Sequence, residues 1–269
     1  MEEKQKRARG RPRAFNDQSE NKTVRALDRG IAVLAALAEG DGVSLTELAE
    51  RAGEPVSTVY RALSTLQNHE VVEFEETTQL WFIGAGAFRI GSVFLKRTNI
   101  LERSRPVMRA LMRDTGETAN LGIERGDRVL FISQAESRQT IRAFFPPGTR
   151  NLMHASGIGK ALLAAFPQEQ VDRIVREQGL ERFTDTTITD PDDLRRELET
   201  VRRKGYAVDN EERTEGMRCI ASVIHDANGD PVAGVSISGP AFRIPPNATS
   251  ALGERVRTAA AEISKNMGG

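Results

Sequence analysis

The residues best suited to chemistry lie in the run from His154 to Ala161, which places Gly157 and Gly159 just before an apolar stretch. Where such a stretch is helical, the backbone N–H groups of its first turn have no partner inside the helix. They then form a site for an anion, a carboxylate or a phosphate. The GxxxxGK[ST] spacing of a P-loop is missing. Two interpretations stay open, an anion site and a plain helix cap in which glycine serves tight packing.

The single cysteine, Cys219, lies beside Arg218 at the expected start of a strand. With His154 and Asp209 it would supply a nucleophile, a base and an orienting acid. A single cysteine in such a place is more often a small buried hydrophobic side chain. We therefore expect no catalytic residue and no enzyme activity. One cysteine and three histidines in the whole chain also predict no disulfide framework, no metal cluster and no cofactor.

A second polar group follows Pro55 in the N-terminal half. On a helix the outward-facing side chains would be those of Val56, Ser57, Thr58, Tyr60, Arg61 and Ser64. Arg61 can bind guanine through two hydrogen bonds or pair with a phosphate, and Ser57 and Thr58 suit phosphates or base edges. We expect Ser57, Thr58, Tyr60 and Arg61 to contact double-stranded DNA, as in a recognition helix of the major groove. The alternative is the solvated face of an ordinary three-helix domain.

The charge pattern divides the N-terminal half into two parts. Residues 23–85 hold four arginines against ten acidic side chains, a net charge of −6, which weakens attraction to DNA phosphates. Residues 1–22, here called the basic arm, carry +3 and contain the Arg-Gly-Arg-Pro core of an AT-hook at residues 9–12. Arg9 and Arg11 would then lie in the minor groove of A·T-rich DNA. A charged tail that only aids solubility is the other interpretation, and the arm's composition predicts disorder.

The elements that position the recognition residues follow from periodicity and caps. Helices are expected over 23–39, 45–52 and 55–68, and strands over 71–75 and 80–83. Ser44 and Glu47 form a capping box at the start of the second helix, and Gly53 permits the sharp turn after it. Helix, helix, tight turn, helix and hairpin is the order of a winged helix-turn-helix. The expected domains are the basic arm (1–22), this domain (23–85), a linking helix (86–100) and an α+β domain (101–269).

The expected α+β domain alternates strands and helices. Helices are expected over 101–115, 159–166, 168–178 and 191–204 and at the C-terminus, with strands over 119–124, 128–134, 140–145, 206–211, 219–225 and 233–238. Clusters of antiparallel strands with helices between them predict a sandwich of this class.

Composition excludes several classes of protein. Thirty-eight basic side chains balance 38 acidic ones, which excludes a histone-like protein that holds nucleic acid by bulk charge. The longest apolar run, Ile31 to Ala38, is far shorter than the roughly 20 residues that span a bilayer. The polar N-terminus is unlike a signal peptide. We expect a cytoplasmic protein with no membrane partner.

Several segments together resemble the IclR family of bacterial transcription regulators. They are residues 27–31, 57–63, 154–160, 205–212, 216–221 and 235–240, in that order, and the likeness covers about residues 22–268. The resemblance implies an N-terminal winged helix and a C-terminal GAF-like effector-binding domain. It also implies a homodimer formed through the DNA-binding half, often a homotetramer through the effector half, and an inverted-repeat promoter site.

The resemblance also implies an effector site, since members that sense glyoxylate hold the acid in the GAF-like domain. The backbone N–H groups of Gly157 and Ile158 would hold its carboxylate. The aldehyde or hydroxyl end would contact Asp209, Cys219, Ser236 and Ser238, with Met217 as an apolar wall. On the lid of the site, Thr140, Ala143 and Asn151 replace larger apolar side chains. The effector is therefore expected to be glyoxylate or a similar small 2-oxo acid, or alternatively a larger carboxylate.

Two rivals come from other classes of protein. One is a small-acid enzyme built on His154, Asp209 and Cys219. The other is an architectural protein that binds A·T-rich DNA through the basic arm alone.

Overall fold

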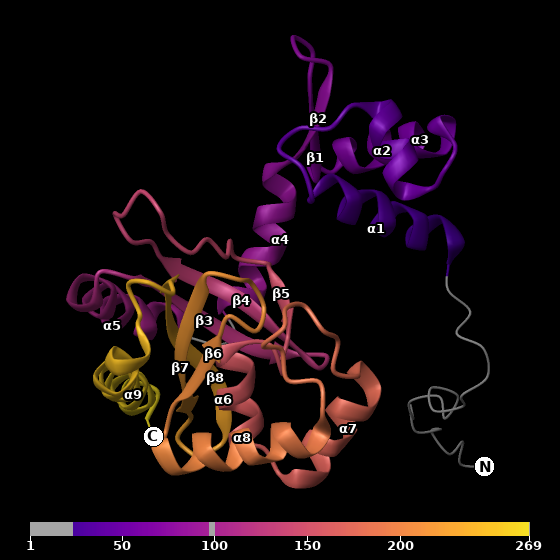
Figure 1. The fold of residues 1–269 in the computed structure, drawn as a ribbon. Coiled ribbons are helices and arrows are strands. Elements are labelled where there is room, and N and C mark those ends of the chain that lie inside the picture. Colours follow the sequence, from indigo (N-terminus) through magenta and orange to yellow (C-terminus); the bar gives the residue numbers. More distant parts are fainter. Residues whose placement is uncertain (1–23, 97–99, 269) are drawn as a thin grey trace, which may run out of the picture. The chain divides into compact units, whose positions relative to one another are not determined.

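The structure is a computed structural model that describes residues 24–96 and 100–268. The basic arm, including Arg9 and Arg11, lies outside the described residues. The chain forms two compact units, which divide between Phe94 and Leu95 (Figure 1). That division falls inside the helix expected to link the two domains. No helix among the described residues is long and apolar enough to cross a membrane.

The N-terminal unit is a winged helix-turn-helix, as the sequence predicts. Its elements are α1 (Arg25–Leu37), α2 (Leu45–Ala52), α3 (Val56–Asn68), β1 (Val72–Glu75), β2 (Leu80–Ile83) and α4 (Ala85–Lys96). Strands β1 and β2 pair antiparallel with Val72 opposite Ile83. The Ser44 side chain accepts a hydrogen bond from the N–H of Glu47 at 3.3 Å and so caps α2. Gly53 ends α2 with φ of 63°, a left-handed conformation that glycine adopts without steric strain.

Helix α1 has two apolar faces. Val33, Ala36 and Leu37 are buried in the core with residues of α2, α3 and the hairpin. Three further apolar side chains, expected from their spacing to share one face with Leu34 and Leu37, are instead 57–67% exposed: Val24, Leu27 and Ile31. The helical spacing of apolar residues therefore predicted the helix correctly. Which of these side chains are buried depends on the elements that pack against the helix.

The C-terminal unit is a three-layer α+β domain (Figure 1). Its elements are α5 (Ile100–Thr115), β3 (Thr118–Arg125), β4 (Arg128–Ala135), β5 (Arg150–Leu152), α6 (Gly157–Ala165), α7 (Gln168–Gln178), α8 (Pro191–Lys204), β6 (Ala207–Asn210), β7 (Met217–His225), β8 (Pro231–Pro240) and α9 (Thr249–Asn266). The six strands form one sheet in the order β5-β4-β3-β8-β7-β6, with every pair antiparallel. Helices α5 and α9 cover one face, and α6 with α7 and α8 covers the other.

One expected strand is wrong. Residues 140–145 form a loop, and the strand beside β4 is β5, several residues later. The N–H of Phe131 donates to the carbonyl of Thr149, and that carbonyl lies beyond Pro146 and Pro147. The N–H of Gly148 donates in turn to the carbonyl of Phe131. Strand β4 thus pairs with β3 on one side and with this later segment on the other, which leaves residues 140–145 no edge of β4 to join. The apolar residues of the loop pack instead, for example Phe145 on Phe131 with ring centroids 5.0 Å apart.

Glycines bring α6 close to the sheet. A Cβ on Gly234 would lie 2.7 Å from a methyl group of Ile158, and one on Gly122 would lie 3.3 Å from the same side chain. A Cβ on Gly159 would lie 2.2 Å from the carbonyl oxygen of Met153. These positions admit no larger side chain without movement, so they fix where the first turn of α6 lies over the sheet.

Candidate functional site

The polar residues predicted for the effector site come together on one face of the sheet. Asp209 of β6 lies opposite Cys219 of β7, and Cys219 lies opposite Ser238 of β8. Ser236 lies two residues before Ser238 and Met217 two residues before Cys219, so both point to the same face. Three strands that are separate in sequence therefore present five of the predicted side chains side by side.

The first turn of α6 lies against this row of side chains. Ser156 is the N-cap, and its hydroxyl accepts from the N–H of Gly159 at 3.4 Å. A Cβ on Gly157 would lie 2.9 Å from the sulfur of Cys219, so only glycine allows this approach. The Gly157 N–H donates toward that sulfur. The N-terminal end of the helix, with its partial positive charge, therefore faces Cys219, whose cross-strand neighbours are Asp209 and Ser238.

Burial controls protonation in the cluster. It raises the pKa of Asp209 to about 7, and the carboxylate of Glu212 adds to this effect, while Lys160 opposes it. Burial and the nearby Asp209 carboxylate raise the pKa of the Cys219 thiol to about 11. Near neutral pH the thiol therefore keeps its proton and Asp209 is divided between its two forms, so the site offers hydrogen-bond donors to an anion.

Ser236 and Ser238 both lie within hydrogen-bond reach of the Cys219 thiol. The Ser236 side chain is fully buried. The Ser238 hydroxyl also accepts from the Asn120 amide at 3.2 Å, which leaves its own proton free to donate. The thiol and the two hydroxyls therefore form one polar group that can offer hydrogen bonds to an incoming oxygen atom.

Sequence reasoning missed two members of this cluster. Asn120 of β3 is fully buried, and its amide oxygen accepts from Gln134 of β4 at 3.0 Å. The signal available in the sequence was an asparagine between the apolar residues Ala119 and Leu121 of the strand. Both residues continue the polar row across the sheet, since Asn120 lies opposite Ser236 and also opposite Gln134.

The three residues predicted for the lid differ in exposure. Ala143 is 3% exposed and belongs to the loop before β5, whereas Thr140 in the same loop is exposed. Asn151 lies on β5 and is also buried. Met217, Cys219 and Asp209 are half-buried, so solvent reaches the cluster from their side.

The arrangement does not favour nucleophilic catalysis. A cysteine nucleophile needs a lowered thiol pKa, and that of Cys219 is raised. His154 lies with its Nε2 atom 3.0 Å from the carbonyl oxygen of Glu181, and its ring stacks on Phe183. Burial lowers the pKa of His154, so near neutral pH its ring is uncharged.

The exposed face of α3 carries the residues predicted to contact DNA. Ser57 and Arg61 are exposed, Tyr60 is 54% exposed and Thr58 is half-buried. Arg61 makes no ion pair with any residue that the structure describes. Its guanidinium group is therefore available for a phosphate or a guanine.

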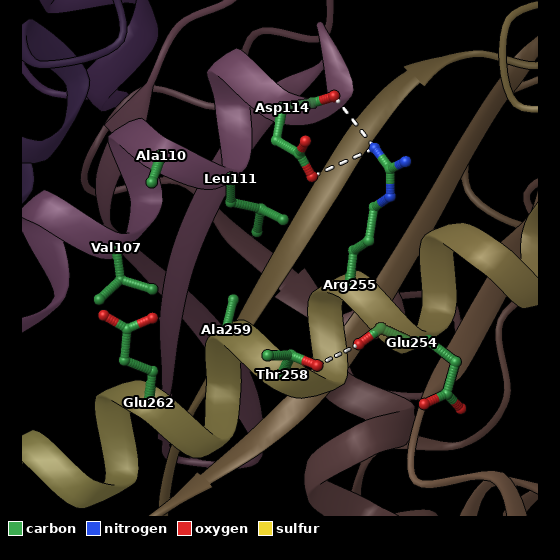
Figure 2. Close-up of a pocket in the computed structure, with 9 residues that line it drawn as sticks. All are labelled: Val107, Ala110, Leu111, Asp114, Glu254, Arg255, Thr258, Ala259 and Glu262. Carbon is green, nitrogen blue, oxygen red and sulfur yellow. Dashed lines mark hydrogen bonds and ion pairs between the residues drawn. The ribbon is translucent and has the colours of Figure 1, made fainter.

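A separate groove lies on the opposite face of the sheet, between α5 and α9 (Figure 2). Its volume is about 370 Å³, and apolar side chains such as Val107, Leu111 and Ala259 line it. Arg255 pairs with Asp114 across its rim at 3.1 Å. No residue predicted for effector or DNA binding lines this groove.

Comparison with known proteins gives the same organisation. Residues 26–76 match the IclR helix-turn-helix domain, and residues 92–265 match the bacterial transcriptional regulator IclR C-terminal domain. The HTH-type transcriptional regulator BhcR of Paracoccus denitrificans is 51% identical over 97% of this chain and 95% of that protein. The HTH-type transcriptional repressor AllR of Klebsiella pneumoniae is 40% identical, over 97% and 96%.

A solved structure agrees with these matches. The crystal structure of the Thermotoga maritima IclR covers 92% of this chain and 100% of its own, with a TM-score of 0.77 and 31% identity. The two domain matches span most of the chain, in the order that the fold shows. The chain belongs to the IclR family of bacterial transcriptional regulators, and it is a DNA-binding regulator rather than an enzyme.

Proposed function

We propose that this regulator acts as a homo-oligomer in the bacterial cytoplasm, and that a small 2-oxo acid, glyoxylate first among them, changes its affinity for an inverted-repeat promoter site. The observation that carries the proposal is the meeting of the α6 N-terminus with the row Asp209, Cys219 and Ser238. Helix N-termini bind carboxylates, and the row offers donors for a neighbouring oxygen.

The two ends of glyoxylate fit different parts of the site. Its carboxylate accepts hydrogen bonds from the backbone N–H groups of Gly157 and Ile158. Its aldehyde oxygen, or the hydroxyl groups of its hydrate, bonds to Asp209 and Cys219 and to the hydroxyls of Ser236 and Ser238. The position of the buried Ser236 and Ser238 hydroxyls beside the Cys219 thiol supports this assignment. Met217 forms the apolar wall.

The response follows from linkage between two binding events. An acid that binds one quaternary arrangement better than another shifts the population toward it, and the DNA affinity changes by the same coupling factor. Helix α4, between the two domains, transmits the bias to the spacing of two α3 helices. Two symmetric α3 helices require half-sites on one face of the duplex.

Exposed apolar side chains support the homo-oligomer. They are Leu27 and Ile31 on α1, with Val24 just before it, and Phe88, Ile90 and Val93 on α4, each 57–74% exposed. Large apolar side chains grouped at helical spacing on a surface mark an interaction site. We assign this surface of the DNA-binding half to the homodimer.

Calorimetric titration of the full chain with glyoxylate, pyruvate and 4-hydroxybutyrate tests the effector. Saturable glyoxylate binding near one per chain is expected, and Asp209→Ala abolishes it while Asp185→Ala, an exposed aspartate of the same domain, does not. Glyoxylate binding that survives Asp209→Ala would show that the site is misplaced.

A larger carboxylate is the second candidate. The predicted lid residues Ala143 and Asn151 are buried and are smaller than the apolar side chains they replace, so they would leave room for a larger effector. Benzoate added to the same titration series decides between the two. Binding of benzoate with no heat from glyoxylate would keep the site and change the effector.

Selection of operator fragments from genomic DNA tests the DNA-binding scheme. The selected fragments are expected to contain an inverted repeat, and a chain lacking residues 1–22 still selects them with reduced affinity. Loss of all sequence-specific binding on that deletion would instead support an architectural protein that binds A·T-rich DNA through Arg9 and Arg11.

A further inference from the structure

A fully buried lysine lies close to Asp209, one of the predicted effector residues. Lys160 of α6 is 0% exposed, and its ammonium group donates to the carboxylate of Glu212 at 2.6 Å and to that of Glu197 at 3.0 Å. It also donates to the carbonyl oxygen of Val208 at 2.6 Å. A buried ammonium group needs such partners, since removing it from water without them is very unfavourable. Lys160 thus joins α6, α8, β6 and the turn after β6.

The turn after β6 is held from both of its ends. The Asp209 carboxylate accepts from the N–H of Glu212 at 2.9 Å, and the Glu212 carboxylate accepts from the N–H of Asn210 at 3.4 Å. Glu211, between them, has φ of 64°, a left-handed conformation that is unfavourable for a side chain of this kind. Because the Glu212 carboxylate is itself bound to Lys160, this ion pair fixes the turn and the carboxyl group of Asp209 with it.

We propose that Lys160 and Glu212 are positioning residues of the effector site: they hold the turn that presents Asp209, and their opposite charges decide whether Asp209 donates or accepts a hydrogen bond. The inference rests on the proposed effector site and adds to it two residues that no effector atom needs to touch.

The charges around Asp209 have defined directions. Glu212 stands beside it in the turn and favours its protonated form, while Lys160 from α6 favours its ionised form. Cys219 faces it from β7 and stays a thiol, because its pKa is raised to about 11. The backbone N–H groups of Glu212 and Arg213 donate to the Asp209 carboxylate and favour its ionised form. Glu197 of α8 contacts Lys160, and the positive charges of Lys160 and Arg213 act on His154.

The effector is an anion, so its binding is linked to the proton on Asp209. A protonated Asp209 donates a hydrogen bond to the incoming oxygen, whereas an ionised Asp209 repels the carboxylate. Since burial raises the pKa of Asp209 to about 7, small changes in the two neighbouring charges switch its role near neutral pH.

Opposite shifts in two variants test the proposal. Glu212→Gln removes a negative charge and keeps an oxygen for Lys160, so the protonation midpoint of Asp209 falls by about one pH unit or more. Lys160→Met removes the positive charge, so the midpoint rises by a similar amount. Glu199→Gln, at an exposed position of α8, removes a charge of the same sign and leaves the midpoint unchanged. Two substitutions that only destabilised the fold would not lower the Asp209 midpoint in one variant and raise it in the other.

The midpoint is measured on the full chain labelled with [γ-¹³C]aspartate, by carbon NMR against pH, with the Asp209 signal identified by its loss in Asp209→Asn. This readout needs no effector, so it decides the proposal even where glyoxylate fails to bind. Where Lys160→Met does not fold, Glu212→Gln alone decides it. An unchanged midpoint in Glu212→Gln, or an upward shift, overturns the proposal.

Calorimetry across pH then connects the midpoint to the effector. Glyoxylate affinity is expected to fall about tenfold per pH unit above the midpoint of each variant. If wild type binds glyoxylate with an affinity that does not depend on pH, protonation of Asp209 has no part in effector binding. If wild type does not bind glyoxylate, the effector assignment is overturned, and the positioning roles of Lys160 and Glu212 are still decided by the NMR midpoints.

Discussion

Asp209 and Cys219 lie directly opposite each other on β6 and β7, and a Cβ on Gly157 of α6 would lie 2.9 Å from the cysteine sulfur. The aspartate raises the pKa of the thiol, and burial raises the pKa of both side chains. The pair therefore carries protons at a pH where an isolated aspartate has lost its own. Protonated groups at the positive end of a helix suit the binding of an anion.

The stability of the fold is expected to depend on pH through Asp209. Its pKa rises from 3.8 to about 7 on folding, so the folded state binds its proton more tightly than the unfolded state does. The stabilisation is complete below pH 4 and is lost as the pH rises toward 7. Relative to Asp209→Asn, the free energy of unfolding of wild type should fall by about 1–2 kcal/mol between pH 5.5 and 8. Urea unfolding at both pH values measures this difference.

Using the difference between the two proteins isolates this aspartate. His154, whose pKa burial lowers, acts in the opposite direction, since its stabilisation is lost as the pH falls. It is present in both proteins and cancels. A difference that stays constant from pH 5.5 to 8 would show that Asp209 titrates at its ordinary pKa.

Alanine at Gly157 should weaken effector binding and should destabilise the fold less than alanine at Gly159. The new methyl group would lie 2.9 Å from the sulfur of Cys219 and displace it. Overpacking of this kind costs about 1–3 kcal/mol, and a tenfold loss of glyoxylate affinity is expected by calorimetry. Gly159→Ala provides the contrast: its Cβ would lie 2.2 Å from the Met153 carbonyl oxygen, so the loss should appear in thermal stability. Equal effects of the two variants on stability would contradict this prediction.

Arg61→Ala should weaken operator binding by about tenfold, because a bidentate contact to a base contributes about 1–3 kcal/mol. Arg89→Ala removes the same charge from α4, where Arg89 pairs with Glu70 at 3.4 Å, and serves as its control. Fluorescence anisotropy on the selected operator measures both. Equal operator affinities of the two variants would show that Arg61 has no role in DNA recognition.

Glutamate at Leu27 and Ile31 should separate the protomers. Both side chains are more than half exposed on α1, so the change leaves the core of the domain intact. Charges buried in an apolar interface are unfavourable. Sedimentation velocity is expected to show a smaller species, whereas Thr77→Glu in the exposed hairpin turn leaves the mass unchanged. An unaltered assembly in the double variant would place the dimer contact elsewhere.

Removal of the α2 cap should destabilise the DNA-binding domain modestly. Ser44→Ala deletes the hydroxyl that accepts the Glu47 N–H, and loss of such a cap costs about 1 kcal/mol. The thermal transition of the N-terminal domain should fall while glyoxylate affinity is unchanged. A thermal shift confined to the C-terminal domain would contradict it.

Local signals in the sequence determined much of this protein. The capping pair Ser44 and Glu47, Gly53 in its left-handed turn and the apolar period of α3 predict the winged helix-turn-helix, and the structure confirms it. Caps and glycines act within a few residues, so a linear pattern is sufficient to detect them. The family resemblance added the predicted effector residues, and all of those on strands lie on one face of the sheet.

Only the tertiary structure decided the features that depend on distant segments. The pattern of residues 140–145 predicts a strand, but the edge of β4 pairs instead with the later residues 150–152, and its other edge pairs with β3. The burial of Lys160 depends on Glu197 and Glu212, which are 37 and 52 residues away. No local pattern marks a lysine as buried, since its partners are set by how helices and strands pack. For the same physical reason, the exposure of Val24, Leu27 and Ile31 emerged only once the core was known.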